Sequence, residues 1–406
     1  MKTKLPTKMA MLSISLFLMS HLAIAPAIPK LYALYHGENP NIGLASVESL
    51  VTIPAMMITI FVMLSHFVVA TLGKKKTIQL GLVLILISGL VSFLTKQFAV
   101  ALFCRLLLGV GIGLYNSLSI SIISDYYEGD ERASMIGFRT ATLNIGKALT
   151  TFIVGLALLV GVNYTYLVYL LVIPVYVFFS KYVPETSSGS LSLKKATYFN
   201  QAVLYLMLIT FFVGISYIGA TIKIPSLLVN KYHYSSFYAS NLLTILAFSG
   251  ILIGLVFGQL TKYLKDKTLA AMIFLMGLGN LIFTFATHSA FFILAALLIG
   301  ASFVGTMSSV FDYIAKHFKK EHNHFVTSLA ITAGNIGVIL TPVLLTKLPA
   351  QLQLEMFITP FYMTSGFMLV NLILYGLLVK KTSQEKVRPL HACFFCTESV
   401  MIGLKR

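Results

Sequence analysis

The side chains most able to do chemistry in this sequence are ionisable groups that interrupt long apolar runs. Glu48, Arg105 and Lys147 are the clearest cases, because each is surrounded in sequence by apolar residues. A guanidinium keeps its charge and therefore needs a water-filled cavity or an acidic partner. A buried Lys can bind an anionic group or exchange a proton, and a buried carboxylate can carry a proton. These three residues are therefore candidate substrate-binding or proton-coupling groups.

Each candidate also has a purely structural interpretation. Arg105 could reach toward the membrane surface or pair with carbonyl groups, and Lys147 could pack against polar groups of a neighbouring helix. Glu48 could be an ordinary acid near a helix N-terminus, where the helix dipole favours it. Asn144 and Asn335 could contact a substrate, or could hydrogen-bond between closely packed helices. The residue types alone leave both interpretations open.

The composition places these residues in a membrane. The chain has 406 residues, of which 57% are hydrophobic and only 11% are charged, and its mean hydropathy is +0.88. A water-soluble core of this size cannot hide so much apolar side chain. A soluble enzyme, a disordered protein and a coiled coil are therefore excluded, and the sequence is typical of a protein that crosses the membrane many times.

Long apolar runs recur along the whole chain, each close to the ~20 residues that a helix needs to cross the hydrocarbon. We predict twelve spans, near 9–28, 46–70, 78–95, 98–122, 136–160, 163–182, 200–222, 240–262, 269–287, 289–312, 325–347 and 356–379. The first run also resembles a cleaved signal peptide. Its removal would leave eleven helices, so we expect it to be retained as a span.

The net charge of +17 is distributed as a membrane protein distributes charge. Lys and Arg gather in every second segment between spans, as in 74–76, 194–195 and 316–320, whereas the alternate segments hold few. This pattern predicts that both termini are cytoplasmic. No basic and aromatic stripe typical of nucleic-acid binding is present, so no nucleic-acid partner is expected.

Short matches at one spacing indicate an internal repeat. Thr77 and Thr268 each follow a Lys-rich loop, Gly109 and Gly300 end similar helical segments, and Asn144 and Asn335 each begin Asn-Ile-Gly; every pair is 191 residues apart. Two parallel repeats of six helices are the layout of a transporter with a central cavity. We predict four regions: an N-terminal bundle (1–182), a central cytoplasmic loop (183–199), a C-terminal bundle (200–380) and a cytoplasmic tail (381–406).

Several of these motifs resemble the major facilitator superfamily over about residues 5–382. Gly73-Lys74-Lys75 resembles the end of the family's loop motif after the second helix, although Ala70 and Thr71 replace its Asp and Arg. The segment from Arg105 to Gly113 resembles the family's Arg-x-x-x-Gly-x-Gly pattern. The segment beginning at Asn144 resembles the fifth-helix motif of bacterial drug antiporters but has Thr150-Thr151 in place of Gly-Pro.

The resemblance implies an all-α membrane protein with twelve helices in two six-helix repeats, the major facilitator fold. It also implies that Arg105 takes part in proton coupling or substrate binding. A further set of residues would form a cytoplasmic gate that closes one side through charge pairs, or would make only surface ion pairs: Gly73, Lys74, Lys75, Asp125, Arg132 and Asp312.

The sequence therefore predicts a secondary transporter, and we expect proton-coupled efflux of amphipathic organic compounds in the manner of the drug antiporters. Glu48 and Arg105 would couple protons, and substrate would bind near Arg105, Lys147, Asn144 and Asn335. Two alternatives remain. The first is a transporter of small anionic metabolites, because Arg105 and Lys147 lie deep in the membrane and no acid is predicted at the same depth. The second is a non-transporting receptor, because the loop motif after the second span is degenerate. A monomer in the cell membrane is the family expectation.

No cofactor or enzymatic chemistry is expected. No phosphate-binding loop of the form Gly-x-x-x-x-Gly-Lys-Ser/Thr occurs, so ATP should not drive the protein. The tail contains His391, Cys393 and Cys396, which could be part of a metal site but lack a fourth ligand nearby. We therefore expect no metal, and we expect the tail to be unstructured or bound to the membrane surface.

Overall fold

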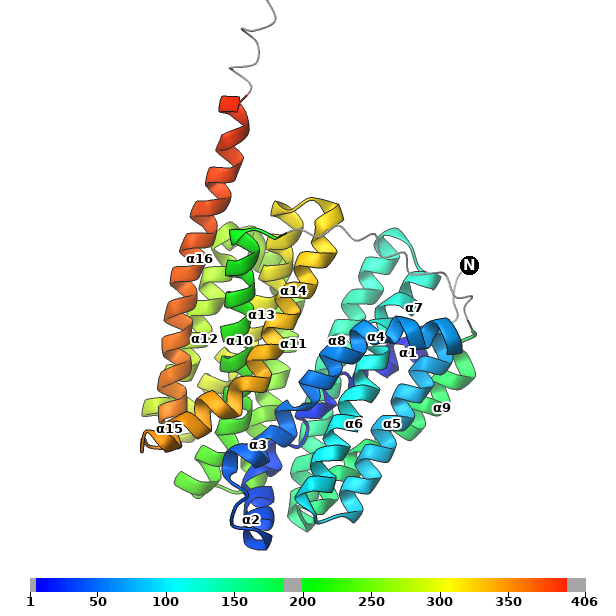
Figure 1. Cartoon of the computed structure of the whole chain (residues 1–406), viewed down its shortest axis with the longest axis vertical. Helices are drawn as coiled ribbons and strands as arrows, with labels where there is room; N and C mark the ends of the chain where they lie inside the picture. Colours follow the sequence, from blue (N-terminus) through cyan, green and yellow to red (C-terminus); the bar gives the residue numbers. More distant parts are fainter. Residues whose placement is uncertain (1–4, 186–198, 393–406) are drawn as a thin grey trace, which may run out of the picture.

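The computed structural model describes residues 5–185 and 199–392, and the regular elements in these ranges are all helical (Figure 1). Twelve helical segments of this part are long and apolar enough to cross a membrane. Their backbone groups are bonded within each helix, as the absence of water in a bilayer core demands. The prediction of an all-α membrane protein with twelve spans is confirmed.

The first bundle contains ten helical segments before residue 185. These are α1 (Leu5–Ser13), α2 (Ile28–Glu38), α3 (Leu44–Thr52), α4 (Pro54–Leu72), α5 (Lys74–Leu94), α6 (Phe98–Asn116), α7 (Leu118–Tyr126), α8 (Gly129–Val160), a run of 3-10 turns (Asn163–Leu171) and α9 (Val172–Tyr182). Shorter 3-10 turns connect α1 to α2, so the first span is irregular at its centre.

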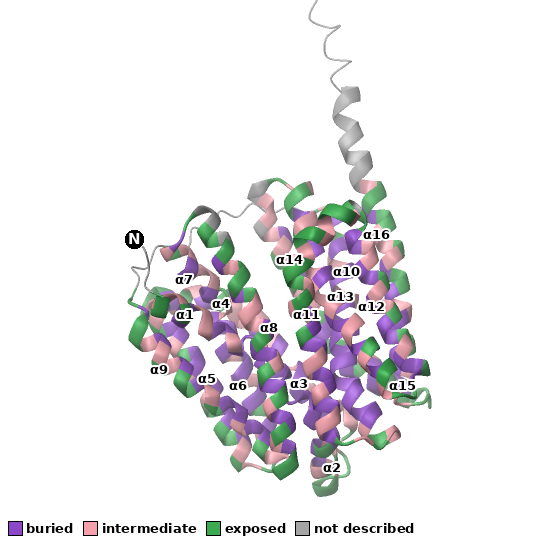
Figure 2. Ribbon diagram, turned by 180° about the vertical axis from the view of Figure 1, so that it is seen from behind, coloured by how far each residue is buried: buried purple, intermediate pink, exposed green. Residues whose placement is uncertain are grey.

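The second bundle begins after residue 199. Its helices are α10 (Gln201–Ser226), α11 (Ser236–Leu264), α12 (Thr268–Phe285), α13 (Ser289–His317), α14 (Lys320–Pro342), α15 (Leu348–Gln351) and α16 (Thr359–Ala392). The helix α10 is buried along much of its length, because the other helices of its bundle and elements of the first bundle pack around it (Figure 2).

Prolines interrupt three of the spans. Pro54 begins α4 directly after the end of α3, Pro225 precedes a π-helical turn at Leu227–Lys231, and Pro342 precedes another at Val343–Lys347. Proline has no backbone N–H and its ring clashes with the carbonyl four residues earlier, so a regular helix cannot continue through it. Such breaks free backbone and side-chain groups for contacts between helices.

The two bundles lie side by side and approach each other unequally (Figure 1). They are joined where α8 packs against α11, where α14 packs against α3 and α4, and where α10 contacts α2 and α3. The bundles lie closest near α3, at the end that also carries α2 and α15, which we call the far end. They spread apart toward the end that carries the tip of α16, which we call the terminal end.

Two predicted spans are too short. The first, predicted at 9–28, covers Leu5–Glu38, and the seventh, predicted at 200–222, covers Gln201–Lys231. The seventh prediction ends just before Lys223, because a Lys is expected to leave the hydrocarbon. In the structure Lys223 is buried and ion-paired, so the helix continues past it.

The prediction for the tail is corrected in part. The last helix continues well beyond the predicted end of its span at residue 379, and α16 reaches Ala392. The first part of the tail is therefore a helix that extends the last span. Cys393 and Cys396 lie outside the described residues.

Candidate functional site

Buried charge in the described residues is mostly positive. Five cationic side chains and one carboxylate are buried: Lys74, Arg105, Arg139, Lys147, Lys223 and Glu48. Two of the cations have a carboxylate partner, since Lys74 pairs with Asp125 and Lys223 pairs with Glu48. Arg105, Arg139 and Lys147 have no carboxylate within ion-pair distance among the described residues. An unpaired buried cation is costly, so an anion is the ligand that these groups favour.

One ion pair connects the two bundles at the far end. Glu48 on α3 and Lys223 on α10 approach to 2.8 Å between Oε1 and Nζ, and their side chains are 0% and 1% exposed. Lys223 also donates to the Thr346 hydroxyl at 2.6 Å, and that hydroxyl donates to Glu48. We call these three residues the interbundle clamp. Removing one partner of such a pair leaves an uncompensated charge in a dry site.

The three members of the clamp come together because each lies beside a proline break. Glu48 precedes the break at Pro54, Lys223 precedes Pro225, and Thr346 lies in the π-helical turn after Pro342. The Thr346 hydroxyl bonds both charged groups, so it satisfies part of their hydrogen-bonding capacity.

Arg105 is buried within the first bundle. Its guanidinium donates to the Tyr169 hydroxyl at 2.6 Å, and Tyr169 in turn donates to the carbonyl of Ser20 at 2.9 Å. The guanidinium carbon also lies 5.5 Å from the ring centre of Tyr166. The Nε and Nη2 groups of Arg105 have no hydrogen-bond partner in the structure. Since a guanidinium presents five N–H donors, this one retains capacity for an anion.

Lys147 is buried at the contact between the bundles. It lies on α8 and donates a hydrogen bond to the hydroxyl of Tyr217 on α10. Its Nζ lies 4.3 Å from the ring centre of Tyr217, which stacks on Phe303 of α13 with ring centres 3.6 Å apart and planes 6° apart. The structure thus gives Lys147 a neutral partner, as the structural interpretation expected, but leaves its charge without an acid.

The helices that carry Arg105 and Lys147 both contact one turn of the first span. This 3-10 turn, Ser20–Leu22, contains His21 and packs against α6 and α8. His21 is 7% exposed, and its Nδ1 has no hydrogen-bond partner among the described residues. We call Arg105 and Lys147 the cation pair. Two buried cations without a carboxylate partner among the described residues could hold an anionic part of a substrate.

Asn144 and Asn335 occupy equivalent places in the two contacts between bundles. Asn335 on α14 donates to the Thr59 hydroxyl on α4 at 2.7 Å. Asn144 on α8 donates to the Thr140 carbonyl, and its Oδ1 lies 3.7 Å from where a Cβ on Gly250 of α11 would stand. Both Asn side chains therefore lie where helices of opposite bundles cross.

The predicted gate residues lie at the terminal end and form contacts within one bundle. Lys74 donates to both carboxylate oxygens of Asp125 at 2.8 Å, and Lys75 donates to the carbonyl of Ser180 at 2.9 Å. Gly73 adopts a positive φ of 81°, which allows the sharp connection from α4 to α5. These contacts hold α5 against α7 and α9.

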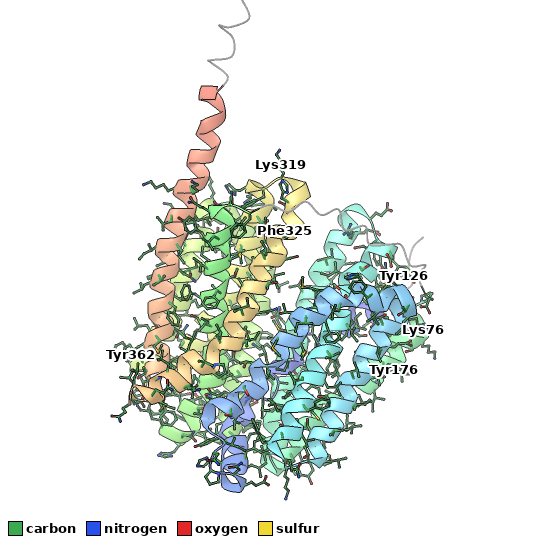
Figure 3. All side chains as sticks on the ribbon, viewed as in Figure 1. Lys76, Tyr126, Tyr176, Lys319, Phe325 and Tyr362 are labelled. Carbon is green, nitrogen blue, oxygen red and sulfur yellow. The ribbon has the colours of Figure 1, made fainter. Side chains whose placement is uncertain are left out.

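The equivalent acid of the second bundle pairs differently. Asp312 bonds Lys316 one turn along the same helix at 2.5 Å, with both side chains well exposed. Lys265 lines the same small surface hollow as Asp312 but makes no ion pair with it. Arg132 is exposed on α8, and Lys319 projects from the terminal end of the second bundle (Figure 3).

Two buried cations were missed by the sequence analysis. Lys223 lies just past the predicted end of the seventh span, and Arg139 lies near the terminal end of α8. Arg139 donates to the Ser119 hydroxyl at 2.7 Å and to the Asn116 side chain at 3.1 Å, at the break between α6 and α7. Lys223 lies between Ile222 and Ile224, and Arg139 lies within a predicted span, which are the signals that could have identified them.

Comparisons with known proteins agree with this architecture. The sequence profile of the Major Facilitator Superfamily matches residues 10–342 and 206–394. The quinolone resistance protein NorB of Staphylococcus aureus (strain JH9) is 25% identical over 189 residues, and the match spans 46% of this chain and 41% of that protein. The chain therefore matches less than half the length of this relative.

Two solved structures share the fold. The nucleoside transporter NupG has a TM-score of 0.76 at 12% identity, covering 92% of this chain and all of that chain, 100%. A D-xylose–proton symporter has a TM-score of 0.73 at 14% identity, covering 91% of this chain and 96% of that chain. At such low identity, the likeness concerns the fold alone.

Proposed function

The chain belongs to the major facilitator superfamily, and we propose that it is a secondary transporter of amphipathic organic compounds that carry a negative charge. Substrate would bind between the two bundles and be exposed to each side of the membrane in turn. We further propose that the protein works as a monomer in the cell membrane, with both termini in the cytoplasm.

The observation that carries this proposal is the cation pair. Arg105 and Lys147 are 1% and 2% exposed, and neither has a carboxylate partner among the described residues. A transporter of cations would be expected to place acids at this depth, whereas an anionic substrate would supply the missing charge. The unpartnered N–H groups of Arg105 support the same conclusion.

The contacts between bundles support alternating access. The clamp holds the far end, and the Lys147–Tyr217 and Asn335–Thr59 bonds lie nearer the middle of the spans. The bundles spread apart at the terminal end (Figure 1). With the termini in the cytoplasm, the structure would correspond to a state that is closed outward and open inward.

The clamp also provides a route for proton coupling. When the far end opens, Glu48 separates from Lys223 and meets water, where it can take up a proton. A neutral Glu48 cannot pair with Lys223, so the closed far end forms again only after the proton is released. Proton binding at Glu48 would therefore favour the state with an open far end.

Export of drugs is the second candidate function. It is favoured by the likeness to a quinolone resistance protein, which covers 189 residues. In this case the protein would couple proton influx to the efflux of amphipathic compounds, and the cation pair would have a structural or coupling role.

Transport by purified protein in liposomes distinguishes the candidates. We would measure exchange of radiolabelled naphthalene-2-sulfonate, whose permanent charge prevents leakage, beside efflux of the cation ethidium with a pH dye inside. Sulfonate exchange that falls ~10-fold or more in Lys147→Gln supports the proposal, since a hydrogen bond to a charged group contributes ~1.5–3 kcal/mol.

The matched control is Lys231→Gln, which removes a Lys that is about a third exposed and lies at the far end. It should leave sulfonate exchange unchanged. Ethidium efflux coupled to protons, without sulfonate exchange, would instead establish the second candidate. No flux of any solute would favour a non-transporting receptor.

A further inference from the structure

Among the described residues, the Lys147 ammonium makes one hydrogen bond, and an anion would replace the acceptor of that bond. Its acceptor is the neutral hydroxyl of Tyr217, which belongs to the opposite bundle. A bond from the ammonium to an ionised acceptor adds the attraction between opposite charges, which a neutral hydroxyl does not provide. A substrate anion that reached Lys147 would therefore replace the tyrosine hydroxyl, and the ring of Tyr217 would remain beside the new pair.

The ring of Tyr217 is already part of an aromatic stack. It lies parallel to Phe303 at 3.6 Å between ring centres, and the two rings come from different helices of the second bundle. Tyr217 is 3% exposed, whereas Phe303 is only partly buried. Phe303 is thus the member of the stack that a ligand can reach.

The Lys147 ammonium lies close to the aromatic stack. Lys147 Nζ is 4.3 Å from the ring centre of Tyr217. An anionic oxygen bonded to that ammonium would lie ~2.8 Å from it, which leaves a planar group attached to the anion within reach of the ~4.5–7 Å at which rings interact. A saturated group of equal size would keep the charge contact but lose the ring contact.

From this arrangement we infer that Lys147, Tyr217 and Phe303 form one site that selects planar aromatic anions. This inference rests on the proposed function, which requires only that the substrate is anionic. Lys147 of the first bundle would bind the charge, and the stack of the second bundle would bind the ring. A ligand bound in this way contacts both bundles. Its binding can therefore shift the equilibrium between different arrangements of the two bundles.

The test is a set of binding measurements by calorimetry on the full chain in detergent. The probes are naphthalene-2-sulfonate, its saturated analogue decahydronaphthalene-2-sulfonate and the neutral naphthalene-2-sulfonamide. Wild-type protein should bind the aromatic sulfonate about 2- to 10-fold more tightly than the saturated one, as expected for one ring contact. It should bind the sulfonamide more weakly still.

Variants then locate the preference. Phe303→Leu and Tyr217→Leu should bring the ratio of aromatic to saturated affinity close to one, whereas Tyr217→Phe, which keeps the ring, should retain it. The matched control is Phe274→Leu, because Phe274 is a 54% exposed phenylalanine of the same bundle. The wild-type ratio itself needs no variant, so a misfolded mutant cannot hide the answer.

Two outcomes would overturn the inference alone. Equal affinity of the wild type for the two sulfonates would show that the site does not distinguish an aromatic ring from a saturated one. The proposal of anion transport would be unaffected by that result. A preference that survives in both leucine variants would place the ring elsewhere. If the sulfonamide bound as tightly as the sulfonate, or if nothing bound, the proposed function would fall together with the inference.

Discussion

The two bundles are built on one repeat but differ in chemistry where they face each other. The spacing of 191 residues that relates Asn144 to Asn335 also relates Thr59 to Gly250, so the two contacts between bundles are equivalent. The three buried cations without a carboxylate partner among the described residues are not repeated. Arg105, Arg139 and Lys147 of the first bundle correspond to three buried apolar residues of the second, Ala296, Ala330 and Val338.

The second bundle contributes aromatic rings instead. Tyr217 and Phe303 correspond by the same spacing to Pro26 and Ile112, which carry no ring. In the site that we propose, the halves would share a scaffold and divide the recognition between charge and ring. Apolar scaffolds of this kind tolerate such changes, because packing of the spans depends on small residues and shape more than on any one side chain.

The interbundle clamp has the opposite distribution of charge. There the first bundle supplies the acid and the second bundle supplies the cation. We expect Glu48→Gln to have the largest effect on the structure, since it leaves Lys223 charged and unpaired in a dry site. Breaking a buried pair costs ~3–5 kcal/mol, which corresponds to a loss of the closed far end on the order of 100-fold or more.

This loss can be measured as a distance across the far end. Spin labels at Glu38 on α2 and Gln351 on α15, in a variant without its native cysteines, should move apart in Glu48→Gln. The double variant Glu48→Gln with Lys223→Met should recover the short distance, because both charges are then absent. An unchanged distance in the single variant would show that the clamp does not hold the bundles.

The next effect tests the asymmetry directly. Lys147→Gln should weaken binding of naphthalene-2-sulfonate ~10- to 100-fold, because a hydrogen bond to a charge contributes ~1.5–3 kcal/mol. Val338→Thr, at the equivalent buried position of the second bundle, should change binding by less than about 3-fold. Calorimetric titration compares the two. Equal losses would mean that the charge in the first bundle has no special role.

A smaller effect is expected for the equivalent asparagines. Asn335→Ala removes a bond between bundles, whereas Asn144→Ala removes a bond within α8. One neutral hydrogen bond contributes ~0.5–1.5 kcal/mol, so Asn335→Ala should lengthen the label distance at the far end in part of the population. Asn144→Ala should leave that distance unchanged. The opposite order would remove the distinction between the two contacts.

The smallest effect is expected where an ion pair is exposed. Lys231 and Glu355 lie 2.9 Å apart, with side chains 31% and 44% exposed. Partial burial acts to raise the pKa of Glu355, but bonds from the Ile358 N–H and from Lys231 outweigh it and hold this pKa below its usual value. Glu355→Gln should lower stability by ~1 kcal/mol or less at neutral pH.

The pH dependence of this pair follows from the direction of the shift. A carboxyl group with a lowered pKa stabilises the folded state above its unfolded pKa of ~4.3 and stops doing so as pH falls through the folded value. The gap in thermal stability between wild type and Glu355→Gln should therefore close under acid conditions. A gap that widens in acid would contradict the assignment.

Much of the fold follows from the sequence, because spans are long and polar backbone cannot remain unpaired in lipid. The span predicted at 163–182 matches the helical segment Asn163–Tyr182 at both ends, and the one predicted at 240–262 lies within four residues of Ser236–Leu264. The errors arise at charged residues inside helices. Lys223 was expected outside the membrane, and only its pairing with Glu48 from a distant segment allows it to stay buried.

The candidate site was predictable only in part. The sequence identifies Arg105, Lys147 and Glu48 as residues that need an explanation, because charges in apolar runs are rare. It does not reveal their partners, since Tyr169, Tyr217 and Thr346 are common residue types at ordinary positions. Partner choice depends on where proline breaks and crossing helices bring side chains together, and a single sequence carries no spacing signal for that.

The most direct test of the division between charge and ring is a structure of the protein with 6-bromonaphthalene-2-sulfonate bound, in which the bromine locates the ring. We expect a sulfonate oxygen ~2.8 Å from Lys147 Nζ, with the ring against Phe303 and the hydroxyl of Tyr217 displaced. A ligand bound away from both bundles' facing surfaces, with Lys147 still bonded to Tyr217, would contradict this expectation.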